Sequence, residues 1–158
     1  DIITGSKHMA DLFEETIAAY VLLAVYMPIV AGMAGNAATQ TLVVLVRGIA
    51  LKQIDLKTAW ITLKNELGAG FINGLINGLI VVAVVYIKDQ NLMIALILGL
   101  SIVFNLIIAA FFGTLIPLIL KRMGRDPASS AAVFITTATD VLGFMIFLGL
   151  ATLILKHL

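Results

Sequence analysis

Three long, almost uncharged stretches dominate the sequence: 67–87, 90–120 and 127–155. The first two contain no charged residue, and the third contains only Asp140. Each is longer than the ~20 residues that a helix needs to cross the hydrocarbon core of a bilayer. Charged residues make up 12% of the chain and hydrophobic residues 61%, whereas an ordinary soluble domain has about 25% and 45–50%. The sequence therefore predicts an all-α membrane protein and argues against a soluble globular enzyme.

A fourth apolar region covers residues 16–51. As one helix it would be roughly 50 Å long, well beyond a ~30 Å hydrocarbon core, so it must be interrupted or project from the bilayer. Two separate spans are disfavoured, because the second, 36–51, would be short and would contain Arg47. We therefore expect one long, broken helix. Three residues that loosen or break helices are the candidates for the interruption: Pro28, Gly32 and Gly35.

The complete fold prediction is a polytopic helical bundle. The long broken helix is followed by three further transmembrane helices, at about 66–87, 92–121 and 128–155. Residues 10–158 are expected to form one transmembrane domain. Residues 1–9 are set apart as a vector-derived or disordered tail, because GSKHM at 5–9 resembles an expression-vector scar.

The few charges predict an orientation. Seven of the ten basic residues lie in 47–66 and 121–127, two segments separated by two crossings. The positive-inside rule makes both segments cytoplasmic and leaves both termini outside. An outside N-terminus suggests one further helix upstream of residue 10. The net charge of +1 gives no field that would attract nucleic acid, and the lack of cysteine excludes thiolate chemistry.

Asp140 is the one ionised side chain deep inside a predicted span. A carboxylate at mid-membrane costs about 2.5–3.5 kcal/mol on insertion scales, so such residues usually line an ion pathway. Thr136 and Gly143 lie four residues before it and three after it, and can share its helical face. The alternative is that Asp140 pairs with a neighbouring donor and only locks helices together.

A second polar group lies within the long helix. Asn36, Thr39 and Gln40 follow i, i+3, i+4 spacing and therefore face one way, and Gly35 just before them can free a backbone carbonyl. Together with Asp140 they supply only oxygen ligands, which hard cations such as Mg²⁺ and Ca²⁺ prefer. The alternative is a kinked helix whose polar groups hold helices together.

Small residues recur at four-residue spacing at Gly70, Gly74 and Gly78. This pattern allows two helix backbones to approach closely, so we interpret these glycines as packing residues.

Four segments resemble the MgtE-type magnesium transporters. The first is PIVAGMAGNAATQTLVVLVRGIA at 28–50, which is similar to the family pattern P-x-x-x-G-x-x-G-N-x-x-x-Q. The second, KNELGAGFINGLING at 64–78, is followed by a match over 118–127. The last is TATDVLGFMIFLGLA at 137–151, which resembles the final family helix with its intramembrane aspartate.

The resemblance implies a homodimeric Mg²⁺ channel in the cell's inner membrane, with a pore on the two-fold axis between the long helix and the last helix. Asp140 matches the carboxylate that recognises the hydrated ion, Gly35, Asn36 and Thr39 fall on the pore segment, and Thr136 lies one turn before Asp140. Ala38 departs from the family, which commonly has Gly there. The first family helix and the cytosolic magnesium-sensing domains are absent from this sequence and are expected in a full-length parent.

Two other functions remain open at this stage. One is a Na⁺- or H⁺-coupled divalent cation exchanger, because broken helices and a single intramembrane acid also occur in such proteins. The other is a non-transporting membrane assembly subunit.

Overall fold

The computed structural model describes the backbone of residues 2–155 and the side chains of residues 18, 20–128 and 130–155. Within these residues the chain forms four helices and no strand, which confirms the all-α prediction. The helices are α1 (Ile2–Ala50), α2 (Ala59–Asp89), α3 (Leu92–Arg122) and α4 (Pro127–Leu155).

All four helices are long and apolar enough to cross a membrane. Within the residues whose side chains are described, the candidate spans are Tyr20–Ala50 in α1 and Ser130–Leu155 in α4, whereas α2 and α3 qualify over their whole length. A helix of 31 residues, such as α2 or α3, is about 46 Å long and therefore extends past both edges of a ~30 Å core.

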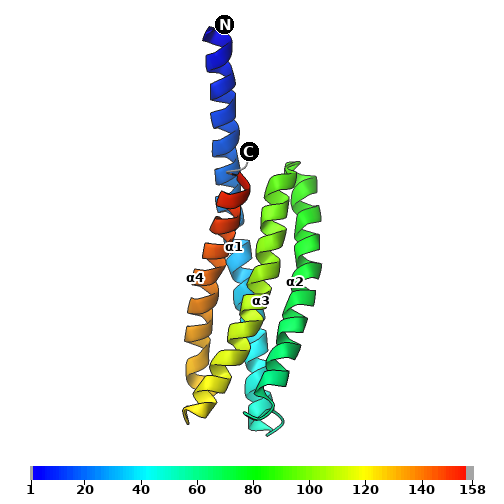
Figure 1. Cartoon of the computed structure of the whole chain (residues 1–158), viewed down its shortest axis with the longest axis vertical. Coiled ribbons are helices and arrows are strands. Elements are labelled where there is room, and N and C mark those ends of the chain that lie inside the picture. The colour runs from blue at the N-terminus through cyan, green and yellow to red at the C-terminus, as the bar shows by residue number, and fades with distance from the viewer. Residues whose placement is uncertain (1, 156–158) are drawn as a thin grey trace.

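The predicted interruption of the first helix is not present. α1 continues through Pro28, Gly32 and Gly35 as one helix of 49 residues. Proline removes one backbone hydrogen bond, but Tyr26 and Val30, on either side of Pro28, are both buried in the bundle and hold the helix there. The excess length is accommodated by projection, since the N-terminal part of α1 extends beyond the other helices (Figure 1). α1 begins at Ile2, and the vector origin of residues 1–9 stays a prediction.

α3 lies at the centre of the bundle. α1, α2 and α4 all pack extensively against it, and α1 also packs against α4, whereas α2 has extensive contacts with α3 alone (Figure 1). α3 is accordingly apolar around its whole circumference and carries the largest set of buried residues.

Local sequence signals explain the two short turns. α2 ends where Gln90 adopts a left-handed backbone with φ 52°, and Asn91 then caps α3 by accepting a hydrogen bond from the Ile94 N–H at 3.1 Å. After α3, Gly124 takes φ +69°, which suits a residue without a side chain. Asp126 then accepts a hydrogen bond from the Ala128 N–H at 3.0 Å, and Pro127 occupies the first position of α4, where its missing N–H is not needed.

The backbones of α2 and α3 approach each other closely along a row of glycines. A Cβ atom on Gly70 would lie 2.9 Å from the Leu106 carbonyl oxygen, and one on Gly74 would lie 3.0 Å from the Cα atom of Val103. Glycine at these positions therefore brings the two helix backbones into direct contact.

The loop after α1 folds back against the end of α3. Lys121 donates a hydrogen bond to the Ile54 carbonyl at 3.0 Å, and its Nζ lies 3.5 Å from the Asp55 carboxylate. The Leu56 backbone N–H donates to the same carboxylate at 2.7 Å. This hydrogen bond, together with the nearby Lys121, lowers the pKa of Asp55 below its ordinary value. The salt bridge thus connects the loop between α1 and α2 to the C-terminal end of α3.

Candidate functional site

Asp140 lies at the middle of α4, and its side chain is exposed on the outer face of the bundle. It makes no hydrogen bond or ion pair with any residue of the described chain. The carboxylate is therefore neither buried in this chain nor paired within it. A single chain alone in a bilayer would present this charge to lipid, which is costly.

Thr136 shares the exposed face of Asp140, and its hydroxyl donates to the Ala132 carbonyl at 2.9 Å. The hydroxyl oxygen remains able to accept a hydrogen bond from a ligand or a water molecule. Gly143 does not share this face. It is buried against α3, where a Cβ atom would lie 3.3 Å from the Nδ2 atom of Asn105.

The polar residues of α1 also face outward. Asn36, Thr39 and Gln40 are exposed, and with Val43 and Val44 they line an open groove of about 500 Å³. The Thr39 hydroxyl donates to the Gly35 carbonyl at 2.8 Å. Pro28 and Gly32, which were expected to shape the pore, are exposed further along the helix, and Gly35, which was expected at the metal site, is half-buried.

The packing of α1 against α4 places Asp140 and the polar residues around Asn36 at a similar depth along the bundle. Toward one end of the bundle, Ala131 and Ile135 of α4 belong to the same buried cluster as Ala38 and Leu42 of α1. Toward the other end, Phe147 and Ala151 cluster with Leu23, Tyr26 and Val30. Asp140 lies midway between the two α4 pairs, so its depth corresponds to a position on α1 between Val30 and Ala38. This is the segment that contains Gly35 and Asn36.

The described residues contain no group of three or more His, Cys, Asp or Glu side chains that could hold a metal ion. One chain thus offers a single carboxylate and several neutral oxygens at this depth. Such a set suits a cation that keeps most of its water, because Mg²⁺ commonly binds proteins through one or two carboxylates and retains several waters.

A smaller polar pocket, which the sequence did not predict, lies between α1 and α2. Gln40 lines it together with Thr41, Glu66 and Asn73, and Leu106 and Ala110 of α3 also contribute to its wall. Its volume is about 70 Å³. The expected helix begins only at about residue 66, whereas α2 begins at Ala59, so Glu66 lies two turns inside the helix. The seven-residue spacing of Glu66 and Asn73, two helical turns, is the sequence signal that could have placed both on one face.

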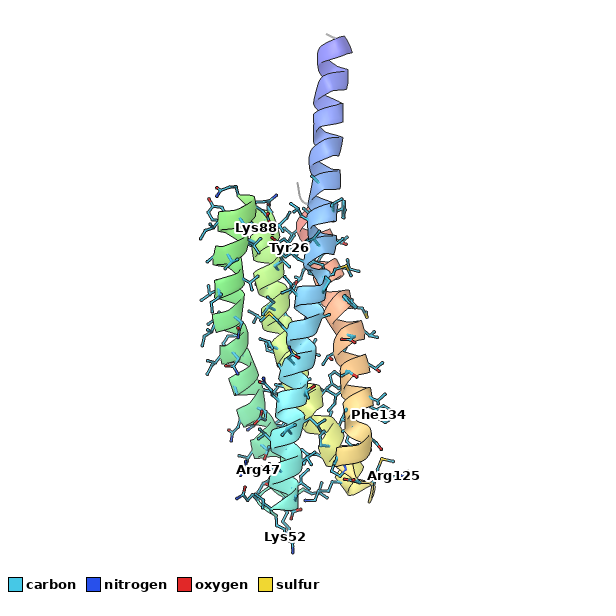
Figure 2. The ribbon with its side chains drawn as sticks, turned by 180° about the vertical axis from the view of Figure 1, so that it is seen from behind. Tyr26, Arg47, Lys52, Lys88, Arg125 and Phe134 are labelled. Carbon is cyan, nitrogen blue, oxygen red and sulfur yellow. The ribbon has the colours of Figure 1, made fainter. Side chains whose placement is uncertain are left out.

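The two ends of the bundle differ in charge. Arg47, Lys52 and Arg125 lie at one end, and Tyr26 and Lys88 lie toward the other (Figure 2). At this second end, the Tyr26 hydroxyl donates a hydrogen bond to the Asp89 carboxylate, and the Lys88 ammonium lies 5.7 Å from the centre of the Tyr26 ring. We call the end with Arg47, Lys52 and Arg125 the basic end. It contains segments 47–66 and 121–127, which carry seven of the ten Lys and Arg residues.

Comparison with known proteins gives a consistent result. Residues 27–150 match the family model MgtE, which is described as a divalent cation transporter. The magnesium transporter MgtE of Bacillus subtilis is 32% identical over 157 residues, which are 99% of this chain and 34% of the relative. For the magnesium transporter MgtE of Thermus thermophilus, the identity is 31%, over 98% of this chain and 35% of the relative. The protein of the same name from Enterococcus faecalis is 30% identical over 145 residues, which are 92% of this chain and 32% of the relative. The chain spans about a third of the length of these relatives.

Proposed function

Because the chain belongs to the MgtE family of divalent cation transporters, we propose that it forms the membrane pore domain of a magnesium transporter, without catalytic activity. The relatives it matches are named magnesium transporters, and all four helices are long and apolar enough to cross a membrane. The transported ion is Mg²⁺. Cytosolic sensor domains in a full-length parent stay a prediction.

The position of Asp140 carries this proposal. An exposed, unpaired carboxylate at the middle of a membrane helix is unfavourable against lipid and favourable in a water-filled path. A second copy of the chain, packed against the outer face of α1 and α4, removes Asp140 from lipid and brings two carboxylates to one axis. We therefore propose a homodimer with the pore on its two-fold axis.

In this pore the ion keeps its inner waters. Mg²⁺ gives up water reluctantly and requires near-octahedral geometry at ~2.0–2.1 Å. The two Asp140 carboxylates attract the cation, and the side chains of Asn36, Thr39 and Thr136, together with the backbone near Gly35, bind its water molecules. Acidic side chains in a pore select cations, and binding through water is weak enough for the ion to leave. Gln40 adds a further polar side chain to the open groove, whose wall also includes Val43 and Val44.

The orientation follows from the charges. We propose that the basic end, with segments 47–66 and 121–127, lies in the cytoplasm and the C-terminus lies outside, in the inner membrane of the cell. The membrane potential then drives Mg²⁺ inward, because moving one elementary charge through 100 mV releases about 2.3 kcal/mol.

Flux measurements on the protein, reconstituted in liposomes with a Mg²⁺-sensitive dye inside, test the role of Asp140. We expect Asp140→Asn to reduce Mg²⁺ flux at least tenfold while the protein stays folded. Thr152→Ala is the matched control, because Thr152 is also an exposed residue of α4 that bonds only to a carbonyl of its own helix, and it should retain the flux. Normal flux in Asp140→Asn would overturn the proposal and favour an assembly subunit.

The same liposomes separate a channel from an exchanger. A channel carries Mg²⁺ under a membrane potential without a gradient of Na⁺ or H⁺, whereas an exchanger requires one of these gradients. Flux that appears only with a Na⁺ or H⁺ gradient would replace the channel proposal with the exchanger.

Single cysteines test the dimer, since the native chain has none. Val141 is exposed beside Asp140, and Val141→Cys should form a disulfide between two chains under mild oxidation. Leu79→Cys, on the exposed face of α2, is the control and should remain monomeric. Equal cross-linking at both sites would contradict a two-fold axis near Asp140.

A further inference from the structure

An apolar groove with an arginine on its wall lies between α2 and α3 at the basic end of the bundle. Its volume is about 460 Å³, and its lining includes Trp60, Leu63, Leu115, Leu118, Ile119 and Arg122. The volume falls within the roughly 300–1,000 Å³ of typical ligand pockets. The groove is separate from Asp140 and from the polar residues of α1, so the proposed transport pathway does not account for it.

Arg122 is the charged residue of this groove, and no acidic side chain of the described chain neutralises it. It is exposed and makes no ion pair or hydrogen bond with any described residue. Its neighbour Lys121 differs, because Lys121 is bound to Asp55 and to the Ile54 carbonyl. The guanidinium thus remains available to an anion, and its planar set of donors suits a phosphate group.

A second positive charge lies next to the groove. The Lys64 ammonium is 5.1 Å from the centre of the Trp60 ring, within range of a cation–π interaction. Trp60 is 64% exposed, and tryptophan is typical of the boundary between hydrocarbon and headgroups. The groove therefore combines an apolar wall, an interfacial aromatic ring and two cations at one end of the membrane span.

We propose that this groove binds an anionic phospholipid. The acyl chain lies along the apolar side chains of Leu63, Leu115 and Leu118, and the phosphate is bound by Arg122 with support from Lys64. A free phosphate ion would use only the cationic part and leave the apolar wall uncovered. Basic pockets between transmembrane helices are typical sites for anionic headgroups, and each Lys or Arg near an anionic surface contributes about 1 kcal/mol.

Native mass spectrometry of the purified chain tests this proposal with two lipids of identical acyl chains, phosphatidylglycerol and phosphatidylcholine. We expect phosphatidylglycerol to be retained about tenfold more strongly. Arg122→Gln should reduce this preference to about twofold or less, and Arg122→Lys should preserve part of it because the charge remains. Inorganic phosphate at millimolar concentration should not displace the lipid.

Arg125→Gln is the matched control, because Arg125 is an exposed arginine at the same end of the bundle that does not line the groove. It should keep the preference for phosphatidylglycerol. Equal retention of the two lipids by the native chain, or an equal loss in Arg125→Gln and Arg122→Gln, would overturn the proposal. Displacement by inorganic phosphate would also overturn it, in favour of a simple anion site. These binding readouts do not depend on whether the chain transports Mg²⁺.

Discussion

Gly78 of α2 and Gly99 of α3 face each other so closely that a Cβ atom on Gly78 would lie 2.8 Å from the Gly99 carbonyl oxygen. A Cβ atom on Gly99 would in turn lie 3.1 Å from the Gly78 carbonyl oxygen. Both contacts involve backbone atoms, which cannot turn aside as a flexible side chain can. The row of glycines on α2 therefore ends at a point where neither helix has room for a methyl group.

We expect Gly78→Ala to lower the free energy of unfolding by about 1–3 kcal/mol, the usual cost of overpacking. Thermal unfolding in detergent micelles measures the change. Gly68→Ala is the control, because a Cβ atom on Gly68 meets no atom within 4 Å, and it should leave stability equal or slightly higher. An equal loss in both variants would show that the close α2–α3 contact at Gly78 does not determine the effect.

Asn105 is buried in α3 with both polar atoms of its amide unpaired in the described chain. An unsatisfied buried polar group costs about 1–3 kcal/mol, and a leucine of similar size removes this cost. We expect Asn105→Leu to raise the midpoint of thermal unfolding in micelles, whereas Asn73→Leu, at an exposed position, should leave it nearly unchanged. A clear loss of stability in Asn105→Leu would indicate that the amide binds a group from outside the chain.

The Tyr26 hydroxyl connects α1 to the end of α2 through its hydrogen bond to Asp89. We expect Tyr26→Phe to cost about 1 kcal/mol, since hydrogen bonds to charged groups contribute about 1.5–3 kcal/mol and this one is partly exposed. Tyr20→Phe, which alters an exposed tyrosine of the same helix, should have almost no effect. A double-mutant cycle with Asp89→Asn isolates the pair, and a coupling free energy near zero would contradict the assignment.

The contact between Asp55 and Lys121 should weaken in acid. The Leu56 backbone N–H and then Lys121 favour the ionised carboxylate, so the pKa of Asp55 is lower in the folded chain. Its stabilising effect is therefore complete above the ordinary pKa of about 3.9 and disappears as the pH falls through the lowered value. Comparing native protein with Asp55→Asn by thermal unfolding should show a small difference at pH 7 that closes below about pH 4. A difference independent of pH would contradict this.

The helix boundaries show where the sequence was informative. α3 begins and ends, and α4 begins, within one residue of the expected bounds, because Asn91, Gly124 and Pro127 act locally and mark these ends. α2 begins seven residues earlier than expected, since a polar amphipathic segment can form a surface helix as readily as a loop. α1 continues through Pro28 because burial of the neighbouring turns outweighs one missing hydrogen bond.

For the candidate site, the sequence identified Asp140 because it is the one charge in its span. Helical spacing placed Thr136 and Gly143 near it but did not predict where the exposed face of α4 ends. Gly143 lies on the buried side of that boundary, against Asn105. The boundary depends on how α4 is rotated against α3, and this rotation results from packing of side chains that are distant in sequence.

Because α3 is central, destabilising substitutions have different consequences in α3 and in α2. α2 packs extensively only against α3, so a change on the outer side of α2 does not alter the packing of α1 against α4, whose outer surface carries Asn36 and Asp140. A destabilising change in α3 is not local in this way, because α1, α2 and α4 all pack against α3 and all lose contacts. Destabilising substitutions along α3 should therefore weaken the whole assembly, whereas those on the outer side of α2 should remain local.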